Sequence, residues 1–410
     1  MDYTITIVGG GPAGLSAALT FAKAGIYCKI IEKEVFPRDK ICGDALSGKV
    51  ISSLKKIVPS VLNDFMAYPQ FNPCYGIRFI SPGQHELEIP FKPDYPKVNN
   101  EPIRPSGFVA KRIDFDYYLF QKCTNNQFID IIQNSQVVKY EKNSCGILLT
   151  LENGLKYTSN LVLACDGSQS IFARKYAGLQ FEDSHYCGAL RQYYSNVTFE
   201  KEGFLELYFF KDVLPGYFWI FPLGNGIANI GIGMRKDFII KKRINLKKML
   251  SSIIQNQNIL KKRFLHAQPL ESPKGFGLPL GSKKRKIFGD HYLLCGDAAM
   301  LIDPFTGEGI SNAIASGILA AKTAIRAVEV NDFSSTTLST YQNELEEKIG
   351  KELKISYLLQ KLCLYPFLLD AVIKKAAKNQ NLRNTLIAMF NDVDLRKEFK
   401  NPFFYLNLLK

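Results

Sequence analysis

The first thirty residues read as a strand, a glycine turn and a helix. Tyr3 to Val8 alternates threonine with aliphatic residues and leads directly into Gly-Gly-Gly-Pro-Ala-Gly at positions 9–14, which opens an apolar segment from Leu15 to Ala24. The unpaired N–H groups and the positive dipole end of such a helix suit a pyrophosphate. The pattern therefore predicts a βαβ unit built around a bound dinucleotide.

The residues of this turn have separate tasks. Gly9 permits the tight turn, Gly11 leaves no Cβ between the backbone and a phosphate, and Gly14 lets the helix pack closely on the strand. Pro12 suits the first turn of a helix. All four are candidate cofactor-binding residues.

An acidic residue stands where a dinucleotide needs one. The second apolar strand, Cys28 to Ile31, ends in Glu32, close to the spacing at which a carboxylate accepts ribose hydroxyls. Lys33 follows it as a further candidate contact. A lone GxGxxG often marks an ordinary glycine turn, but here strand, helix and acid agree. They leave open whether the dinucleotide is FAD or NAD(P).

Length and composition indicate a globular protein. With 410 residues and 46% hydrophobic content, the chain can bury a large core and form two domains or one elaborated domain. Apolar runs are too short for a membrane span, and the first strand starts at Tyr3, so we expect no signal peptide and a cytoplasmic location. Nine cysteines without CxxC spacing argue against a disulfide framework and against a metal site.

The net charge of +14 favours an anionic partner or simply a lysine-rich surface. The basic clusters at 241–243, 261–263 and 283–286 lack the interleaved aromatic residues of a single-strand binding groove, so we expect no nucleic acid. An anionic substrate or peripheral contact with a membrane stays open.

Two later strands also end in small or acidic residues. Leu161 to Cys165 leads into Asp166 and Gly167, which form either an ordinary turn or a second cofactor contact. Tyr292 to Cys295 leads into Gly296 and Asp297. Because both strands are apolar throughout, we expect them in the same buried sheet as the first strand.

We call the three strand ends with candidate cofactor contacts, at positions 9–14, 166–167 and 296–297, stations. The segment after Asp297 makes the third station the most specific of them. Gly307, Gly309 and Ile310 open a long helix of small residues that reaches about Val328. An NAD-linked enzyme has no evident need for this late station, whereas an extended FAD does. Asp297 can accept ribityl hydroxyls, while the helix N-terminus faces the flavin edge where reduction places negative charge.

The middle of the chain predicts a second sheet. Residues 187–234 are rich in aromatic and β-forming residues, and a hairpin at 77–89 is inserted before them. We therefore expect an α/β fold, α+β overall, with a Rossmann-like FAD-binding domain, an antiparallel-sheet substrate domain and a C-terminal helical segment. The expected divisions are 1–68 with 101–180 and 275–330, then 69–100 with 181–274, and finally 331–410.

The C-terminal region is helical and amphipathic. Pro366 should interrupt it, and the final run at 403–409 suits packing on the core or contact with a membrane. The predicted buried stripe consists of Ile355, Leu358, Leu359, Leu362, Leu368, Leu369 and Val372.

With its three stations in this order, most of residues 1–330 resembles the FAD-dependent monooxygenase superfamily typified by p-hydroxybenzoate hydroxylase. Within it the chain is most similar to the geranylgeranyl reductase family. The matching segments are the PxxKxCG loop at 37–43, Arg112 with Phe115-Asp116, Leu190-Arg191-Gln192-Tyr193-Tyr194, and Pro215-Gly216-Tyr217-Phe218-Trp219-Ile220-Phe221-Pro222.

The last segment departs from the family pattern in one place. Archaeal members have PxxYxWxFP, whereas here one residue separates Pro215 from Tyr217. Related halogenases have WxWxIP, so Tyr217 and Phe221 disfavour halogenation.

The resemblance implies roles along the cofactor. Ala13 and Glu32 would bind the ADP half, Arg112 the pyrophosphate side and Val137 the adenine. The ribityl-isoalloxazine half would meet Asp297, Gly309 and Ile310, with Cys42 and Gly43 near the ring. Because no second GxGxxG is present, NAD(P)H or another external reductant must visit transiently.

The resemblance implies an FAD-dependent oxidoreductase that reduces carbon–carbon double bonds of a hydrophobic, isoprenoid substrate. An alkene that accepts hydride needs a proton on its other carbon, for which Tyr217 and Cys42 are candidates. Alternatively, Tyr217 and Trp219 only line the substrate tunnel. Two rival functions stay open: a monooxygenase of a quinone- or polyketide-like aromatic substrate, and a carrier of electrons or prenyl lipids without turnover.

Overall fold

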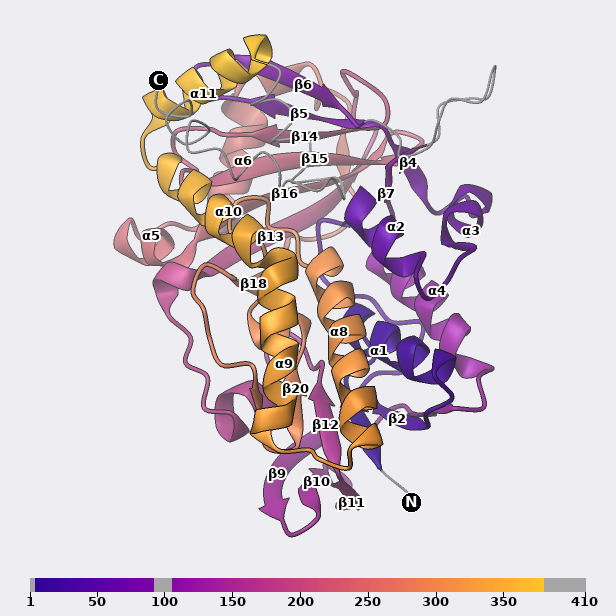
Figure 1. The fold of residues 1–410 in the computed structure, drawn as a ribbon. Helices are drawn as coiled ribbons and strands as arrows, with labels where there is room; N and C mark the ends of the chain where they lie inside the picture. Colours follow the sequence, from indigo (N-terminus) through magenta and orange to yellow (C-terminus); the bar gives the residue numbers. More distant parts are fainter. Residues whose placement is uncertain (1–3, 92–104, 380–410) are drawn as a thin grey trace.

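The computed structural model describes residues 4–91 and 105–379. The strands that end at the three stations lie in one sheet (Figure 1). Its strand order is β19-β20-β12-β1-β2-β8, and all neighbours are parallel except the pair β19 and β20. The strands are β1 (Ile5–Val8), β2 (Cys28–Ile31), β8 (Ile129–Ile132), β12 (Leu161–Ala164), β19 (Phe288–Gly289) and β20 (Tyr292–Leu294). The three predicted stations therefore lie at the carboxyl ends of neighbouring strands.

Helices cover this sheet. Helix α1 runs beside α8 (Figure 1), and α4 packs against α1. Their bounds are α1 (Pro12–Lys23), α4 (Arg112–Thr124), α8 (Ile310–Glu329) and α9 (Ser335–Leu345). Two small antiparallel sheets complete this part: β9 (Val137–Asn143), β10 (Gly146–Leu151) and β11 (Lys156–Ser159) form one, and β3 (Ala45–Leu46), β4 (Asn72–Cys74) and β7 (Gly107–Val109) form the other.

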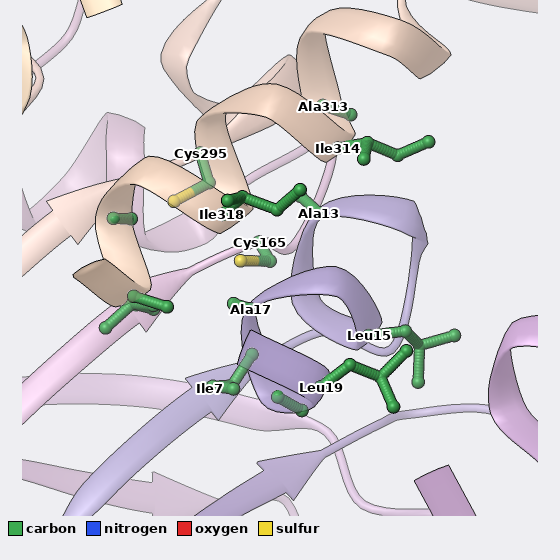
Figure 2. Close-up of a cluster of buried hydrophobic side chains, with 14 of the residues drawn as sticks. Ile7, Ala13, Leu15, Ala17, Leu19, Cys165, Cys295, Ala313, Ile314 and Ile318 are labelled. Atoms are coloured by element: carbon green, nitrogen blue, oxygen red, sulfur yellow. The ribbon is translucent and has the colours of Figure 1, made fainter. Parts of the chain in front are cut away.

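Glycines let the backbones of β1, α1 and α8 touch. Gly9 has φ +101°, and a Cβ on Gly14 would lie 2.0 Å from the Gly9 carbonyl oxygen. A Cβ on Gly317 of α8 would lie 2.1 Å from the Ala13 carbonyl oxygen. Figure 2 shows the resulting core, in which Ala13 and Ala17 of α1 and Ala313, Ile314 and Ile318 of α8 gather with Cys165 and Cys295. Gly14 thus packs the helix onto the strand, as its spacing predicts.

The second sheet contains the inserted hairpin. Its order is β17-β13-β16-β15-β14-β5-β6, with β18 pairing β13. The strands are β5 (Gly76–Ile80), β6 (Glu86–Pro90), β13 (Tyr186–Ser195), β14 (Phe204–Tyr208), β15 (Gly216–Gly224), β16 (Ile227–Arg235), β17 (Gln268–Pro269) and β18 (Lys274–Pro279). The strands from residues 187–234 pair antiparallel as expected, whereas the inserted hairpin joins them through one parallel pair, β5 with β14. The hairpin comes from a distant segment, so no tight turn imposes antiparallel pairing there.

The two faces of this sheet are covered differently. One face packs on the helices α5 (Lys236–Lys241), α6 (Leu246–Asn256) and α7 (Asn258–Lys261). The other face meets the C-terminal helices α10 (Lys351–Leu362) and α11 (Pro366–Lys378). The remaining helices, α2 (Gly48–Leu54) and α3 (Val61–Ala67), follow the loop that leaves β2.

The C-terminal helices follow the predicted pattern with one error. Pro366 starts α11, and Ile355, Leu359, Leu369 and Val372 are buried. Leu358 is 54% exposed, so its place in the buried stripe was wrong. The buried positions of α10 and its C-cap recur at Ile355, Leu359 and Cys363, and at 100° per residue Leu358 lies off this face and meets solvent. The run at 403–409 lies outside the described residues.

The close contact between α8 and α1 makes Gly317 intolerant of a side chain. We expect Gly317→Ala to lower the free energy of unfolding by about 1–3 kcal/mol, because its methyl group meets backbone that cannot move aside. Chemical denaturation measures the change. In the matched variant Gly350→Ala the nearest atom is a side-chain carbon at 3.6 Å, so stability should be kept or slightly raised. Equal stability of the two variants would contradict the packing argument.

Candidate active site

One cavity of about 590 Å³ joins the two sheets. Its walls run from the glycine turn after β1, past the ends of β12 and β20, to the face of the second sheet that carries Trp219. The cavity therefore has a polar part along the parallel sheet and an apolar part under the second sheet.

The glycine turn leaves open space in front of Gly11. A Cβ there would have a single neighbour within 4 Å, the Nη2 atom of Arg38 at 4.0 Å. Glu32 is buried beside the turn, where its Oε2 accepts a hydrogen bond from the Gly10 N–H at 2.6 Å and its Oε1 accepts one from Glu34 N–H at 3.0 Å. The carboxylate is thus held in place with acceptor capacity to spare.

Two arginines share one aspartate near this turn. Arg112 donates from Nε and Nη2 to Asp116, each at 2.7 Å, and Arg38 donates from Nη1 to the same carboxylate at 2.7 Å. Burial raises the pKa of Asp116, but the two guanidinium groups outweigh it and hold that pKa below its usual range. Arg38 also donates to the Gly10 carbonyl at 3.2 Å. A fixed positive charge therefore stands at the open turn.

The end of β12 supplies a carboxyl group with a free acceptor. Asp166 Oδ1 is buried and has no hydrogen-bond partner among the described residues, while Oδ2 accepts from the Phe172 N–H at 3.5 Å. Burial raises the pKa of Asp166 to about 6. Gly167 and Val137 line the same part of the cavity. An orphaned buried oxygen of this kind suits a hydroxyl donor from a bound molecule.

The third station lies at the start of α8. Asp297 lines the cavity and forms an ion pair with Lys40, whose Nζ lies 3.1 Å from Oδ2. Gly307 has φ +70°, which a residue with a side chain rarely adopts, and Gly309 directly precedes the helix. The helix N-terminus at Ile310 opens onto the cavity.

The apolar part of the cavity has an aromatic wall. Tyr217, Trp219 and Phe221 of β15 line it, whereas Phe218 and Ile220 pack in the core on the other face of the sheet. This alternation follows from the period of two along a strand. Gly43 packs against the wall, since a Cβ there would lie 3.2 Å from the Phe221 ring.

The two candidate proton donors are both weak acids. The Tyr217 hydroxyl donates to the Thr306 carbonyl oxygen, and burial raises its pKa far above the ordinary value for a phenol. Burial also raises the pKa of the Cys42 thiol, while the neighbouring Arg112 acts in the opposite direction. Arg112 is therefore placed to stabilise a thiolate.

The structure brings nearly all predicted site residues into this one cavity. Gly14 is the exception, because it lies in the interface between α1 and β1. The residues that line the cavity are Gly9, Gly11, Pro12, Ala13, Glu32, Lys33, Cys42, Gly43, Arg112, Val137, Asp166, Gly167, Tyr217, Trp219, Gly296, Asp297, Gly307, Gly309 and Ile310. Their individual roles stay predictions.

Sequence reasoning missed four polar residues. Arg38 and Lys40 belong to the PxxKxCG loop and Asp44 directly follows it, so the motif was recognised but these side chains were given no role. The signal available for Arg38 was a cation a few residues after Glu32, in a loop leaving the cofactor end of a strand. Asn229 carries no such signal, since its contacts with Trp219 and Cys42 arise only when β15 and β16 meet the loop.

Comparison with known proteins shows the family. Models of an FAD binding domain and of a geranylgeranyl reductase catalytic domain match residues 2–203 and 185–269. The digeranylgeranylglycerophospholipid reductase of Thermoplasma volcanium is 31% identical over 358 residues, which covers 85% of each chain. The chain belongs to the geranylgeranyl reductase family.

Other members agree with this assignment. The menaquinone reductase of Mycobacterium tuberculosis is 26% identical and covers 95% of this chain and 91% of its own. The solved structure of a geranylgeranyl bacteriochlorophyll reductase-like protein from Thermoplasma acidophilum has a TM-score of 0.79 at 27% identity, covering 96% and 98%. The predicted family, fold class and FAD-dependent oxidoreductase activity are confirmed.

The cavity of this geranylgeranyl reductase family member fits FAD. The open space at Gly11, the Asp166 oxygen that has no partner among the described residues and the glycine cradle at Gly307 all line this cavity, at or beyond the ends of the consecutive strands β1, β12 and β20. FAD as cofactor is confirmed by the matching domain. Among the helices of the described residues, none combines the length and apolar character that crossing a bilayer requires.

Arg38 should contribute to FAD affinity. We expect Arg38→Met to weaken FAD binding by about ten- to a hundredfold, because a buried positive charge beside the pyrophosphate position is lost. Titration of FAD-free protein, followed by quenching of flavin fluorescence, measures the affinity. Arg326→Met is the matched control, since Arg326 lies outside the cavity lining, is 46% exposed and pairs with Glu344. Similar affinities in both variants would refute this role.

Proposed function

We propose that this protein reduces carbon–carbon double bonds in the isoprenoid chain of a lipid, with FAD as its resident cofactor. The observation that carries the proposal is a single cavity that passes from the FAD-binding turn to an aromatic and aliphatic wall. The relatives named above are called reductases of a geranylgeranyl phospholipid and of menaquinone, two lipids with long isoprenoid chains.

The apolar part of the cavity supports a chain-like substrate. Its walls come from strands β5 and β14, the aromatic wall on β15, the loop before α8 and the end of helix α10. The lining residues there are Ile77, Leu205, Leu207, Phe209, Trp219, Phe221, Phe305, Gln360 and Cys363. Burying the methyl branches of an isoprenoid against these side chains is favourable by about 25 cal/mol per Å² of apolar surface. The wall also excludes water from the reacting carbon atoms.

The chain's own residues divide the work along the cavity. Glu32, Arg38 and the turn at Gly11 would hold the ADP half of FAD, and Asp297 with the start of α8 would hold the flavin half. Bound FAD supplies the hydride. The helix N-terminus at Ile310 would stabilise the negative charge that reduction places on the ring.

The alkene also needs a proton, and we propose that Cys42 donates it. A thiol is a stronger acid than a phenol, and the Tyr217 hydroxyl already donates to the Thr306 carbonyl oxygen. The raised pKa keeps Cys42 protonated at neutral pH, and Arg112 stabilises the thiolate that is left. Tyr217 is then part of the wall that places the substrate.

Two partners belong to the proposal. An external reductant, NAD(P)H or another donor, must reduce the bound flavin between turnovers. The substrate lipid resides in a bilayer, so the protein should contact a membrane at its periphery.

The function is tested with anaerobic protein reconstituted with FAD and reduced chemically. Incubation with polyprenyl lipids should give products heavier by one H₂ for each double bond reduced, as seen by mass spectrometry. Adding NADH or NADPH to the oxidised protein tests the donor through bleaching of the flavin absorbance. Oxygen uptake coupled to a hydroxylated product would instead support a monooxygenase, and bound FAD without turnover of any lipid would support a carrier.

The proton donor is tested by two single-atom changes. We expect Cys42→Ser to slow alkene reduction by about a hundredfold or more, because a hydroxyl is a much weaker acid than a thiol. Tyr217→Phe should cost less than about tenfold, since only placement of the substrate suffers. Single-turnover rates of the prereduced variants measure both, with reduction of the flavin as the control step. The reverse order of the two losses would make Tyr217 the donor.

A further inference from the structure

Two side chains of strand β13 bind the loop that carries Cys42, one before Cys42 and one after it. Arg191 and Tyr193 are two residues apart and so point to the same face of the strand. Arg191 Nη2 donates to Asp39 Oδ2 at 3.0 Å, and the Tyr193 hydroxyl donates to Asp44 Oδ2 at 2.7 Å. Asp39 and Asp44 flank Cys42 in the sequence. The motif Leu190–Tyr194, whose purpose the family resemblance leaves open, thus contacts both arms of this loop.

One amide then joins the loop to the aromatic wall. Asn229 of β16 lies opposite Tyr193 in the sheet. Its Nδ2 donates to the Cys42 carbonyl and to Asp44 Oδ2, both at 2.8 Å, while its Oδ1 accepts from Trp219 Nε1 at 2.9 Å. A shift of this side chain would therefore move Cys42 and Trp219 together.

The contacts between Asp44 and Asn229 are shielded from water, which strengthens them. Asp44 and Asn229 are fully buried, and the guanidinium of Arg191 stacks on the Tyr193 ring at 4.0 Å. Asp44 has φ +69°, a left-handed conformation that is uncommon for residues other than glycine, although aspartate adopts it more readily than most. The two hydrogen bonds to Asp44 Oδ2 help to hold the loop in this conformation.

We propose that Arg191, Tyr193 and Asn229 form a loop clamp, a set of positioning residues that fixes Cys42 against Trp219 for the transfer of hydride and proton. The loop clamp acts through these two residues, and Tyr193 and Asn229 are not among the residues that line the cavity. This inference rests on the proposed function, because it assigns the clamp to the proton donor and wall named there.

The clamp depends on the charge of Asp44. Facing this carboxylate are Tyr193 and Arg191 of β13, Asn229 of β16, Arg112 of α4 and Cys42 of its own loop. Burial is the largest influence and raises the pKa of Asp44 to about 6, against the hydrogen bonds and cations that lower it. The carboxylate therefore accepts its two hydrogen bonds above this pH and weakens as an acceptor below it.

This titration is distinct from acid unfolding. A raised pKa means that the folded chain binds the proton more tightly than the unfolded chain, so protonation of Asp44 favours the folded state as the pH falls. Loosening of the clamp at mildly acidic pH should thus appear while the fold persists.

The test uses two neighbouring tyrosines. Tyr193→Phe removes one hydroxyl from the clamp, and Tyr194→Phe removes the equivalent hydroxyl from a side chain that binds Gln192 on the other face of the strand. We expect Tyr193→Phe to lower kcat by about ten- to a hundredfold through misplacement, with FAD affinity unchanged. Tyr194→Phe should keep wild-type values.

A second readout needs no substrate. Trp219 is the single tryptophan of the chain, so the intrinsic fluorescence of FAD-free protein reports on the wall. In the wild type its emission should change with a midpoint near pH 6, where the Asp44 carboxyl titrates, while far-UV circular dichroism stays constant. Asp44→Asn keeps an acceptor oxygen but cannot titrate, so it should abolish that transition. Tyr193→Phe should raise quenching of Trp219 by acrylamide, and Tyr194→Phe should not.

The outcomes separate the clamp from the function. Wild-type kcat and quenching in Tyr193→Phe, or equal losses in the two tyrosine variants, would overturn the clamp. A fluorescence transition that survives in Asp44→Asn would overturn the part assigned to its charge. If Tyr193→Phe does not fold, Asp39→Ala decides with the same readouts, since that side chain is 40% exposed. Absence of lipid turnover in the wild type would refute the proposed function, while the fluorescence results still judge the clamp.

Discussion

Contact of backbone with backbone is the constraint on which this structure depends. At Gly14 and Gly317 any side chain would overlap a carbonyl oxygen, so α1 lies directly against β1 and α8 lies directly against α1. This closeness places two helix N-termini, at Pro12 and Ile310, on the same cavity. The partial positive charges of both ends then face one extended, anionic cofactor. A looser packing would separate the two ends and leave them suited to two small ligands instead.

The buried carboxylates differ in how many partners the fold places beside them. Glu32, Asp116 and Asp297 each have a cation or N–H donors within reach, whereas Asp44 and Asp166 each keep one oxygen without a hydrogen-bond partner in the described part of the chain. Burial disfavours the charged forms of Asp44 and Asp166 and raises the pKa of both carboxyl groups. Both acids line the cavity. Unpaired polar atoms there are typical of a site shaped for a partner rather than for stability alone.

Much of this arrangement could be predicted from the sequence, because its signals are local. The strand, turn and helix at the N-terminus, the alternation at 217–221 and the break at Pro366 each follow from neighbouring residues. What could not be predicted depends on distant pairings. The parallel joining of β5 to β14, the sharing of Asp116 by Arg38 and Arg112, and the contacts of Asn229 arise only after segments far apart in the chain have met. A hydrophobic pattern within a short stretch of sequence carries no information about contacts between such distant segments.

The strand order has a consequence for synthesis and for dissection of the chain. Strand β1 pairs with β12, and β12 pairs with β20, so the nucleotide-binding sheet needs Tyr292–Leu294 and then α8 before it is complete. A fragment that ends near residue 203, where the recognised FAD binding domain stops, lacks both. The nascent chain therefore keeps the edge of β12 unpaired until β20 has been made. Pairing of strands so far apart in the sequence is slow. Stable half-proteins should not be obtainable by cutting between the two sheets, since neither sheet is encoded by one continuous segment.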